Sequence, residues 1–80
     1  MRYVYLLQSV NHPRARYIGL TSDLDARLVA HNGGESPHTS KCRPWELCAA
    51  IKFEDDQEAV AFEAYLKTGS GWAFAKRHLW

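Results

Sequence analysis

The chain places two apolar segments close together near its N-terminus, YVYLLQ at residues 3–8 and RYIGL at residues 16–20. Aromatic and β-branched residues favour strands, so both segments are predicted to be β-strands. The connection between them is short and contains Pro13, which is typical of an antiparallel hairpin. Alternation puts the odd-numbered residues of the first strand, including Tyr3 and Tyr5, on one face. Tyrosines of the two strands are therefore expected to lie near each other.

A helix and a third strand are predicted after the hairpin. Residues 21–23 offer side-chain oxygens that cap a helix N-terminus, and apolar residues follow at helical spacing. Two consecutive glycines then supply a left-handed stop, so the helix is expected over residues 22–32. Residues 35–45 are polar and turn-rich, whereas residues 46–53 suit a strand.

Two more helices are predicted in the C-terminal part of the chain. Asp55 or Asp56 would cap a helix that runs to about Lys67, and the Gly-Ser-Gly run at residues 69–71 is expected to end it. Residues 72–80 are expected to form a final short helix. The order ββαβαα predicts an α+β fold, in which a three-stranded antiparallel sheet is flanked by three helices.

Length and composition limit the class of protein. Eighty residues suit a single domain over residues 1–80, and 46% hydrophobic residues with three Trp, four Tyr and three Phe exclude a disordered chain. The N-terminal apolar run is too short for a secretory leader or a membrane span. No membrane association is therefore expected.

The two cysteines are read as free thiols. Cys42 and Cys48 make no disulfide framework, which fits a reducing cytoplasm, and Cys48 is expected to be a small buried residue. A zinc site that combines them with His31 and His38 matches no common ligand spacing.

The net charge of +1 is low for a protein that binds nucleic acid. The charge is uneven, because residues 1–53 hold seven Lys and Arg against four Asp and Glu, whereas residues 54–80 hold three against five. The acidic surplus is concentrated in residues 54–58. A modest positive field over the first two-thirds of the chain permits a polyanionic partner but does not by itself indicate one.

Three polar side chains lie beside the apolar faces of the predicted helices. Arg27 is either a surface side chain with a buried stem or a guanidinium that holds a phosphate oxygen. His31 suits a helix C-terminus through the helix dipole. Glu63 either forms an exposed i,i+4 pair with Lys67, worth about 0.3–0.5 kcal/mol, or provides a carboxylate for Mg²⁺, which needs only one or two. Considered singly, none of these residues indicates a function, and the tyrosines can pair for packing alone.

The order and spacing of these motifs resemble the GIY-YIG nuclease superfamily. The likeness runs from Tyr3 to Lys67 and is closest to small single-domain bacterial members, more distantly to the nuclease domain of an excinuclease. The motifs that carry it are Tyr3-Val4-Tyr5, Tyr17-Ile18-Gly19, an Asp-Leu-x-x-Arg-Leu-x-x-His-Asn helix, Arg-Pro-Trp before a strand, and Glu-Ala-x-x-x-Glu-x-x-x-Lys. Tyr3 replaces the first glycine of the family motif, and Leu20-Thr21-Ser22 stands where some relatives carry a lysine.

The resemblance implies an endonuclease that hydrolyses phosphodiester bonds of DNA with Mg²⁺ or Mn²⁺ and no small-molecule cofactor. Glu63 would be the metal ligand. The implied catalytic residues are Tyr5, Tyr17, Arg27, His31 and Glu63, and the implied substrate-binding residues are Asn32, Thr39 and Lys67.

The implied mechanism has a tyrosine deprotonate the attacking water while Arg27 stabilises charge on the phosphate. A phenol has a pKa of about 10, so Arg27 and the metal are expected to lower it. The sequence leaves open whether Tyr5 or Tyr17 is the base. It also leaves open a non-catalytic binding module and an RNA-directed nuclease. Single-stranded DNA is the expected substrate, with bases stacking on Trp45 or Trp72.

Overall fold

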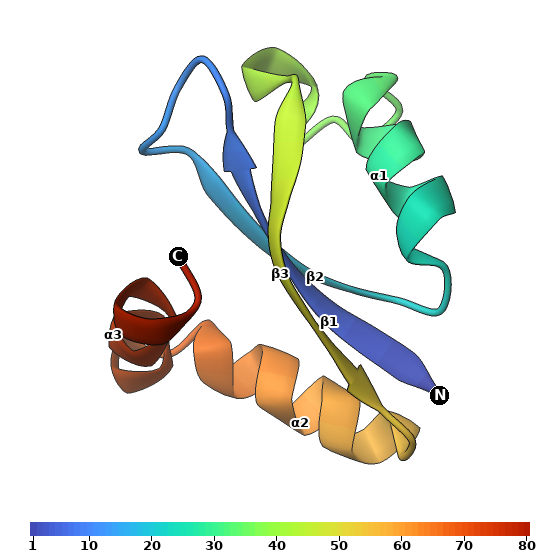
Figure 1. The fold of residues 1–80 in the computed structure, drawn as a ribbon, viewed down its shortest axis with the longest axis vertical. Helices are drawn as coiled ribbons and strands as arrows, with labels where there is room; N and C mark the ends of the chain where they lie inside the picture. Colours follow the sequence, from blue (N-terminus) through green and yellow to red (C-terminus); the bar gives the residue numbers. More distant parts are fainter.

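The central strand of the sheet is β1 (Arg2–Ser9), which pairs with both other strands. The computed structural model describes residues 1–80, and in it β2 (Arg16–Thr21) and β3 (Trp45–Phe53) lie on either side of β1, both antiparallel to it (Figure 1). The hairpin register puts Tyr5 opposite Gly19. The antiparallel hairpin predicted from the two apolar segments is therefore confirmed.

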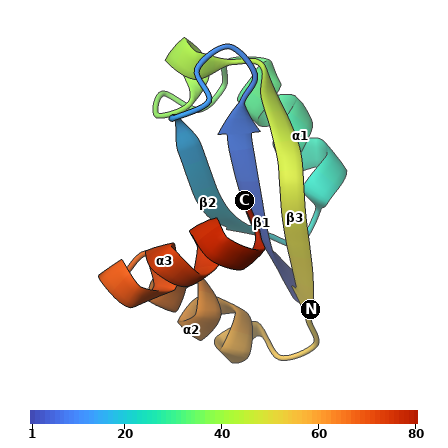
Figure 2. The same cartoon turned by 60° about the vertical axis from the view of Figure 1, so that its left-hand side comes forward.

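Helices cover both faces of this sheet. Figure 2 shows α1 (Leu24–Asn32) on one side, and α2 (Asp56–Leu66) and α3 (Gly69–His78) on the other. A single turn of 3-10 helix, η1 (Ser40–Cys42), precedes β3. The α+β fold with the order ββαβαα is confirmed. The turn η1 is an addition to the predicted elements.

Because side chains alternate along a strand, β1 contributes to two separate apolar clusters. The larger cluster lies between the sheet and the helices α2 and α3, and its buried members are Val4, Leu6, Ile18, Ala59, Leu66 and Ala75. The smaller cluster lies between the sheet and α1, and its buried members are Tyr5, Leu7 and Trp45. The tyrosine motif thus belongs to the α1 face.

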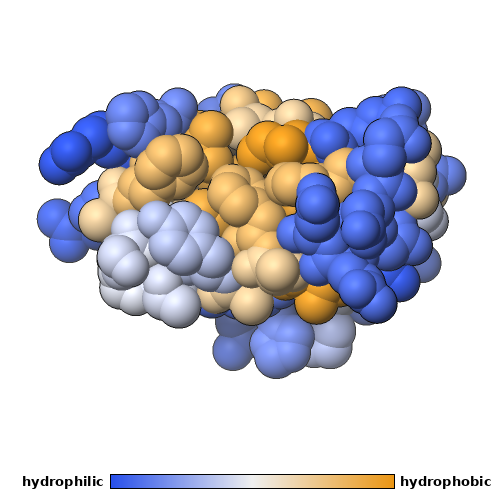
Figure 3. Space-filling view, turned by 90° about the horizontal axis from the view of Figure 1, so that it is seen from below, coloured by the Kyte–Doolittle hydropathy of each residue, from blue (hydrophilic) through white to orange (hydrophobic).

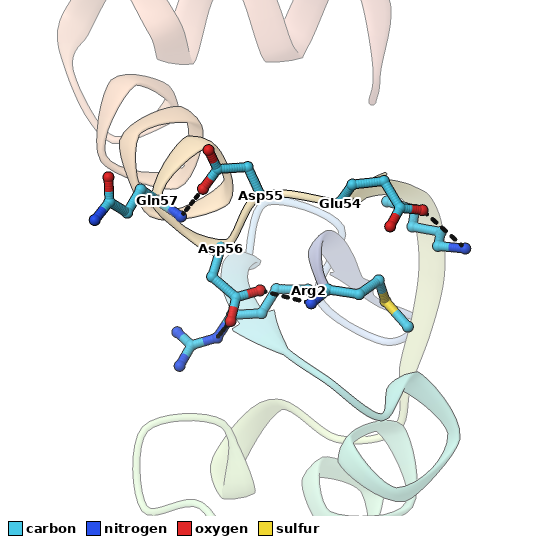
Figure 4. Close-up of polar contacts among 7 residues, drawn as sticks. Arg2, Glu54, Asp55, Asp56 and Gln57 are labelled. Carbon is cyan, nitrogen blue, oxygen red and sulfur yellow. Dashed lines mark hydrogen bonds and ion pairs between the residues drawn. The ribbon is translucent and has the colours of Figure 1, made fainter.

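Carboxylates fix the start of the helices α1 and α2. Asp23 accepts a hydrogen bond from the Ala26 amide at 3.1 Å and caps α1. Asp55 accepts one from the Gln57 amide at 2.8 Å and caps α2 (Figure 4). Such caps satisfy amides that lack a partner in the helix. Both caps agree with the predictions from the sequence, although α1 begins at Leu24, two residues after the predicted start at residue 22.

A pair of ionic contacts ties the N-terminus of the chain to α2. The Asp56 carboxylate lies 2.8 Å from the amino group of Met1 and 3.8 Å from the Arg2 guanidinium (Figure 4). The amino group is the main reason that the pKa of Asp56 is lower than usual. The contacts anchor the first residue of β1 over the helix that packs below it.

The expectation that residues 69–71 end the second helix is wrong, because they form the first turn of α3. The Thr68 hydroxyl caps that turn by accepting from the Gly71 amide at 3.2 Å. A Cβ at Gly71 would overlap the Tyr65 carbonyl oxygen. Glycine is therefore needed here because α3 starts against the end of α2, and not because it terminates a helix.

Some apolar side chains of α2 and α3 face solvent. Seen from below, apolar side chains gather in the middle of the surface, between hydrophilic ends (Figure 3). Val60 is 46% and Phe74 39% exposed, although apolar residues at helical spacing usually mark the buried side of a helix. Cys48 is also exposed instead of buried, because β3 is an edge strand with solvent along one side. None of the helices combines the length and the apolar composition that a membrane span requires.

Candidate active site

The ring of Tyr5 lies across Gly19, its partner on β2. A Cβ built on Gly19 would overlap the Tyr5 hydroxyl oxygen. Any side chain at this position would therefore displace the phenol from the α1 face. The glycine of the Tyr-Ile-Gly motif is required by this close approach and not by a turn.

Three rings from three elements meet on this face. The ring centroids of Tyr5 and Tyr17 are 6.1 Å apart, and those of Tyr17 and His31 are 4.9 Å apart in an edge-to-face arrangement. Both separations lie in the range of favourable aromatic contacts. The prediction that the two tyrosines lie together on one face of the sheet is confirmed.

A chain of buried hydrogen bonds runs through His31. Its Nε2 lies 2.9 Å from the Tyr5 hydroxyl, and its Nδ1 lies 2.7 Å from the Thr39 hydroxyl. The Trp45 indole donates to the Thr39 carbonyl at 2.8 Å. His31 is fully buried, so both of its ring nitrogens are satisfied inside the protein.

The protonation of this chain follows from its partners. Burial, and then the charge of Arg27, lower the pKa of His31, so its imidazole is neutral near pH 7. A neutral imidazole donates through one nitrogen and accepts through the other. The Arg27 Nε–H donates to the Tyr5 oxygen at 3.4 Å. The neutral His31 ring therefore donates to one of the two hydroxyls, of Tyr5 and Thr39, and accepts from the other.

The expectation that Arg27 lowers the pKa of a tyrosine fails for Tyr5. Burial raises the pKa of Tyr5 and outweighs the hydrogen bond from Arg27, which acts in the opposite direction. The same hydrogen bond is the main reason that the pKa of Arg27 is raised. Tyr5 is therefore a neutral phenol at physiological pH, whereas the half-buried Tyr17 lies closer to solvent.

Two residues expected to bind substrate have their polar groups occupied by the protein itself. Thr39 is only 1% exposed and supports His31 from behind. The side-chain amide of Asn32 donates to the Trp45 carbonyl at 3.1 Å and accepts from the Trp45 amide at 2.5 Å, which fixes the start of β3 against α1. Both side chains thus have supporting contacts inside the protein, and their binding of substrate stays a prediction.

Glu63 and Lys67 lie outside this hydrogen-bonded cluster. Glu63 belongs to α2, the helix on the other side of the sheet from α1, and the Lys67 ammonium is 2.5 Å from its Oε2. The Glu63 side chain is only 18% exposed. No hydrogen bond joins Glu63 to Tyr5, Arg27 or His31. Four of the five expected catalytic residues thus lie together on the α1 face of the sheet, namely Tyr5, Tyr17, Arg27 and His31. The fifth, Glu63, lies outside this group on α2.

The carboxylate of Glu63 is a chemically suitable ligand for a divalent metal ion. No group of three or more His, Cys, Asp or Glu side chains is arranged to hold a metal. Mg²⁺ nevertheless binds proteins through one or two carboxylates and keeps several waters. Oε2 of Glu63 is engaged by Lys67, so Oε1 is the oxygen that such an ion would meet first.

The sequence of the whole sheet and of the helices α1 and α2 matches a known family of domains. Residues 1–72 match the model of the GIY-YIG catalytic domain. The chain therefore belongs to the GIY-YIG family of nucleases.

Individual relatives agree with this assignment. The chain is 41% identical over 71 residues to the structure-specific endonuclease subunit SLX1 of Debaryomyces hansenii. The aligned region covers 80% of this chain and 20% of that protein. It is 33% identical over 66 residues to a UPF0213 protein of Lactococcus lactis subsp. cremoris. That aligned region covers 81% of this chain and 65% of that protein. The chain thus spans a fifth of the first relative and just under two thirds of the second.

Proposed function

We propose that the protein is an endonuclease that depends on a divalent metal and hydrolyses phosphodiester bonds of DNA. The observation that carries the proposal is the buried contact of Tyr5 with His31 and Arg27, beside the more exposed Tyr17. A structural role alone would not require a guanidinium to donate to a buried phenol. The relative named as a structure-specific endonuclease supports the same activity.

Tyr17 is the proposed proton acceptor. It is half-buried whereas Tyr5 is 2% exposed, so Tyr17 is the tyrosine that solvent and substrate reach more easily. As a phenolate, Tyr17 takes a proton from the water that attacks phosphorus in line. Arg27, which donates to the neighbouring Tyr5, stabilises charge on the non-bridging phosphate oxygens.

Tyr5 and His31 are positioning residues in this scheme. The Tyr5 oxygen accepts from Arg27 and the Tyr5 hydroxyl is hydrogen-bonded to His31 Nε2, so the guanidinium and the imidazole are held in one orientation. The Thr39 hydroxyl is hydrogen-bonded to the other ring nitrogen of His31 and holds the ring from that side. Preorganised groups of this kind stabilise charge that develops during the reaction without reorganising.

Glu63 is the proposed ligand of Mg²⁺ or Mn²⁺. Such an ion, when bound, polarises the phosphate and stabilises the departing 3′-oxygen. Lys67, which the sequence suggested as a substrate contact, instead neutralises Glu63 in this structure. Bound substrate phosphate would attract Lys67 away from the carboxylate, so substrate and metal would favour the same rearrangement.

A non-catalytic binding module is the second candidate. One observation favours it, because Glu63 lies on a helix on the opposite side of the sheet from α1 and is paired with Lys67. The two functions differ in their need for metal. A module that only binds would show the same affinity with metal and with chelator, and would never cut its ligand.

The experiment is an incubation with one labelled oligonucleotide, alone and annealed to its complement, with Mg²⁺, Mn²⁺ or EDTA. We expect cleavage that requires metal, and faster initial cleavage of the single strand. Binding without cleavage under every metal condition would support the second candidate. A matched RNA oligonucleotide tests whether the activity is restricted to DNA.

A further inference from the structure

A basic cavity lies on the face of the hairpin opposite the tyrosines. Its volume is about 450 Å³, and the residues that line it come from the β1–β2 hairpin and from α3: Gln8, Pro13, Arg14, Arg16, Trp72 and Lys76. Three of the six are cationic and none is acidic. In a chain of net charge +1, this is an unusual concentration of positive charge. The cavity is therefore suited to an anion.

The cavity and the candidate active site lie on opposite faces of the same two strands, β1 and β2. Gln8 and Arg16 are cross-strand partners that line the cavity, and the neighbouring pair, Leu7 and Tyr17, faces the other side of the sheet. β2 is an edge strand, so nothing else of the sheet lies beyond it. A flexible polymer that passes round this edge can contact both faces at once.

Aromatic contacts and unpaired donors lie at the wall of the cavity. The Arg16 guanidinium lies over the ring of Trp80 at 5.2 Å, and Trp80 packs edge-to-face against Trp72 with centroids 4.8 Å apart. Arg16 Nε and Trp80 Nε1 are the only buried side-chain nitrogens or oxygens without a hydrogen-bond partner in the protein. Both are N–H donors, and buried donors are rarely left unpaired.

The hairpin loop on the other side of the cavity is held by hydrogen bonds. The Gln8 side-chain amide donates to the Pro13 carbonyl at 2.8 Å. The Ser9 amide donates to the Ala15 carbonyl at 3.0 Å, and the Ser9 hydroxyl accepts from the His12 amide at 3.1 Å. Arg14 belongs to this loop, so these hydrogen bonds help to fix the position of its backbone.

We propose that this cavity binds one nucleotide of the DNA strand, away from the bond that is cut. Arg14, Arg16 and Lys76 bind its phosphate, and its base stacks on Trp72, which is 37% exposed. Trp45, the other tryptophan considered for stacking, is only 5% exposed and is excluded. The proposal rests on the proposed nuclease function and names the form of its substrate.

The dimensions of the cavity favour a single strand over a duplex. A space of about 450 Å³ suits one nucleotide and is too small for a double helix. In a duplex, moreover, the face of each base is covered by its neighbours and cannot stack on Trp72. Proteins that hold single strands combine cationic grooves with exposed aromatic side chains in this way.

The test measures binding without cleavage. The anisotropy of a labelled single-stranded oligonucleotide is titrated with protein in EDTA, over a series of salt concentrations. The variant R14Q/K76Q removes two exposed cations from the cavity, and its matched control K52Q/R77Q removes two exposed cations elsewhere. Because the cavity binds one phosphate, the loss of two of its three cations should reduce the salt slope by up to about 0.7 in R14Q/K76Q. The control should keep the slope of the natural chain.

A second variant tests the base contact. W72L should bind the oligonucleotide roughly fivefold to 150-fold more weakly, whereas W72F should retain most of the affinity. Competition with a deoxynucleoside monophosphate should be stronger than with inorganic phosphate, because the phosphate ion has no base.

Three results would overturn the proposal: equal salt slopes in the two double variants, unchanged affinity in W72L, or equal competition by the two anions. The proposed nuclease function fails separately, if the natural chain binds DNA in this assay but never cuts it with metal present.

Discussion

The hydroxyl of Tyr5 is held between two charged or polar partners, His31 Nε2 at 2.9 Å and Arg27 Nε at 3.4 Å, in an environment from which water is largely excluded. Tyr17, the other tyrosine of the motif, is half-buried and more accessible. The two tyrosines of one motif therefore have different environments, and their substitution should have different consequences.

Y5F and Y17F should separate stability from catalysis. Y5F leaves a buried imidazole nitrogen without its partner and should cost about 1–3 kcal/mol of stability. Y17F should change stability by less than about 0.5 kcal/mol but should abolish cleavage, because it removes the proposed proton acceptor. Urea unfolding and single-turnover cleavage measure the two effects. A fully active Y17F variant would refute the assignment of Tyr17 as base.

Substitution of Gly19 should displace the Tyr5 side chain, which lies against it. The added methyl of G19A would overlap the Tyr5 hydroxyl in a buried region, so we expect a loss of about 1–3 kcal/mol. Gly69 provides a matched control, because a Cβ there meets nothing within 4 Å. G69A should be neutral or stabilising by up to about 1 kcal/mol. Equal thermal unfolding of the two variants would contradict the close approach.

Stability should fall on mild acidification because of His31. Its folded-state pKa is lower than the unfolded value of about 6.5, so the unfolded chain binds more protons in this range. The stabilisation is fully present above about pH 6.5 and is lost as the pH falls through the folded pKa. Chemical denaturation from about pH 8 to about pH 5 measures the loss, and an NMR titration of the His31 ring identifies the group. A His31 pKa above the unfolded value would contradict the account.

Removal of Lys67 should free the Glu63 carboxylate. In K67Q the ion pair at 2.5 Å is lost, and the carboxylate gains a free oxygen for a cation. We expect half-maximal cleavage at a lower Mn²⁺ concentration than in the natural chain, because the metal no longer competes with an ammonium group. K52Q is the control for loss of one lysine charge, because Lys52 is exposed and lies outside both proposed sites. An unchanged metal requirement in K67Q would separate Lys67 from the metal site.

Local signals predict most of the fold. Alternation in residues 3–8, the caps at Asp23 and Asp55, and the close tyrosines all depend on neighbours in sequence or on one hairpin, and the structure agrees. The glycines at residues 69–71 are ambiguous in sequence, because glycine serves both helix ends and close helix contacts. Only the packing of α3 against α2 distinguishes these two uses.

The supporting groups of the site could not be predicted in the same way. Thr39 and Asn32 acquire their partners when residues 35–45 fold back over α1 and Trp45 docks on the sheet, which no sequence spacing describes. The basic cavity joins Arg16 to Lys76, which are far apart in the chain. A count of charges over long segments of sequence therefore does not reveal that these cations lie together in the folded chain.

The most direct measurement is single-turnover cleavage of a labelled single-stranded oligonucleotide by the natural chain and by E63Q, with Mg²⁺ and with EDTA. E63Q removes one anionic oxygen with little change in shape, so its folding and its binding in EDTA should stay close to those of the natural chain. We predict metal-dependent cleavage by the natural chain and none by E63Q. Cleavage by E63Q at a rate near that of the natural chain, or cleavage by the natural chain in EDTA, would contradict the account.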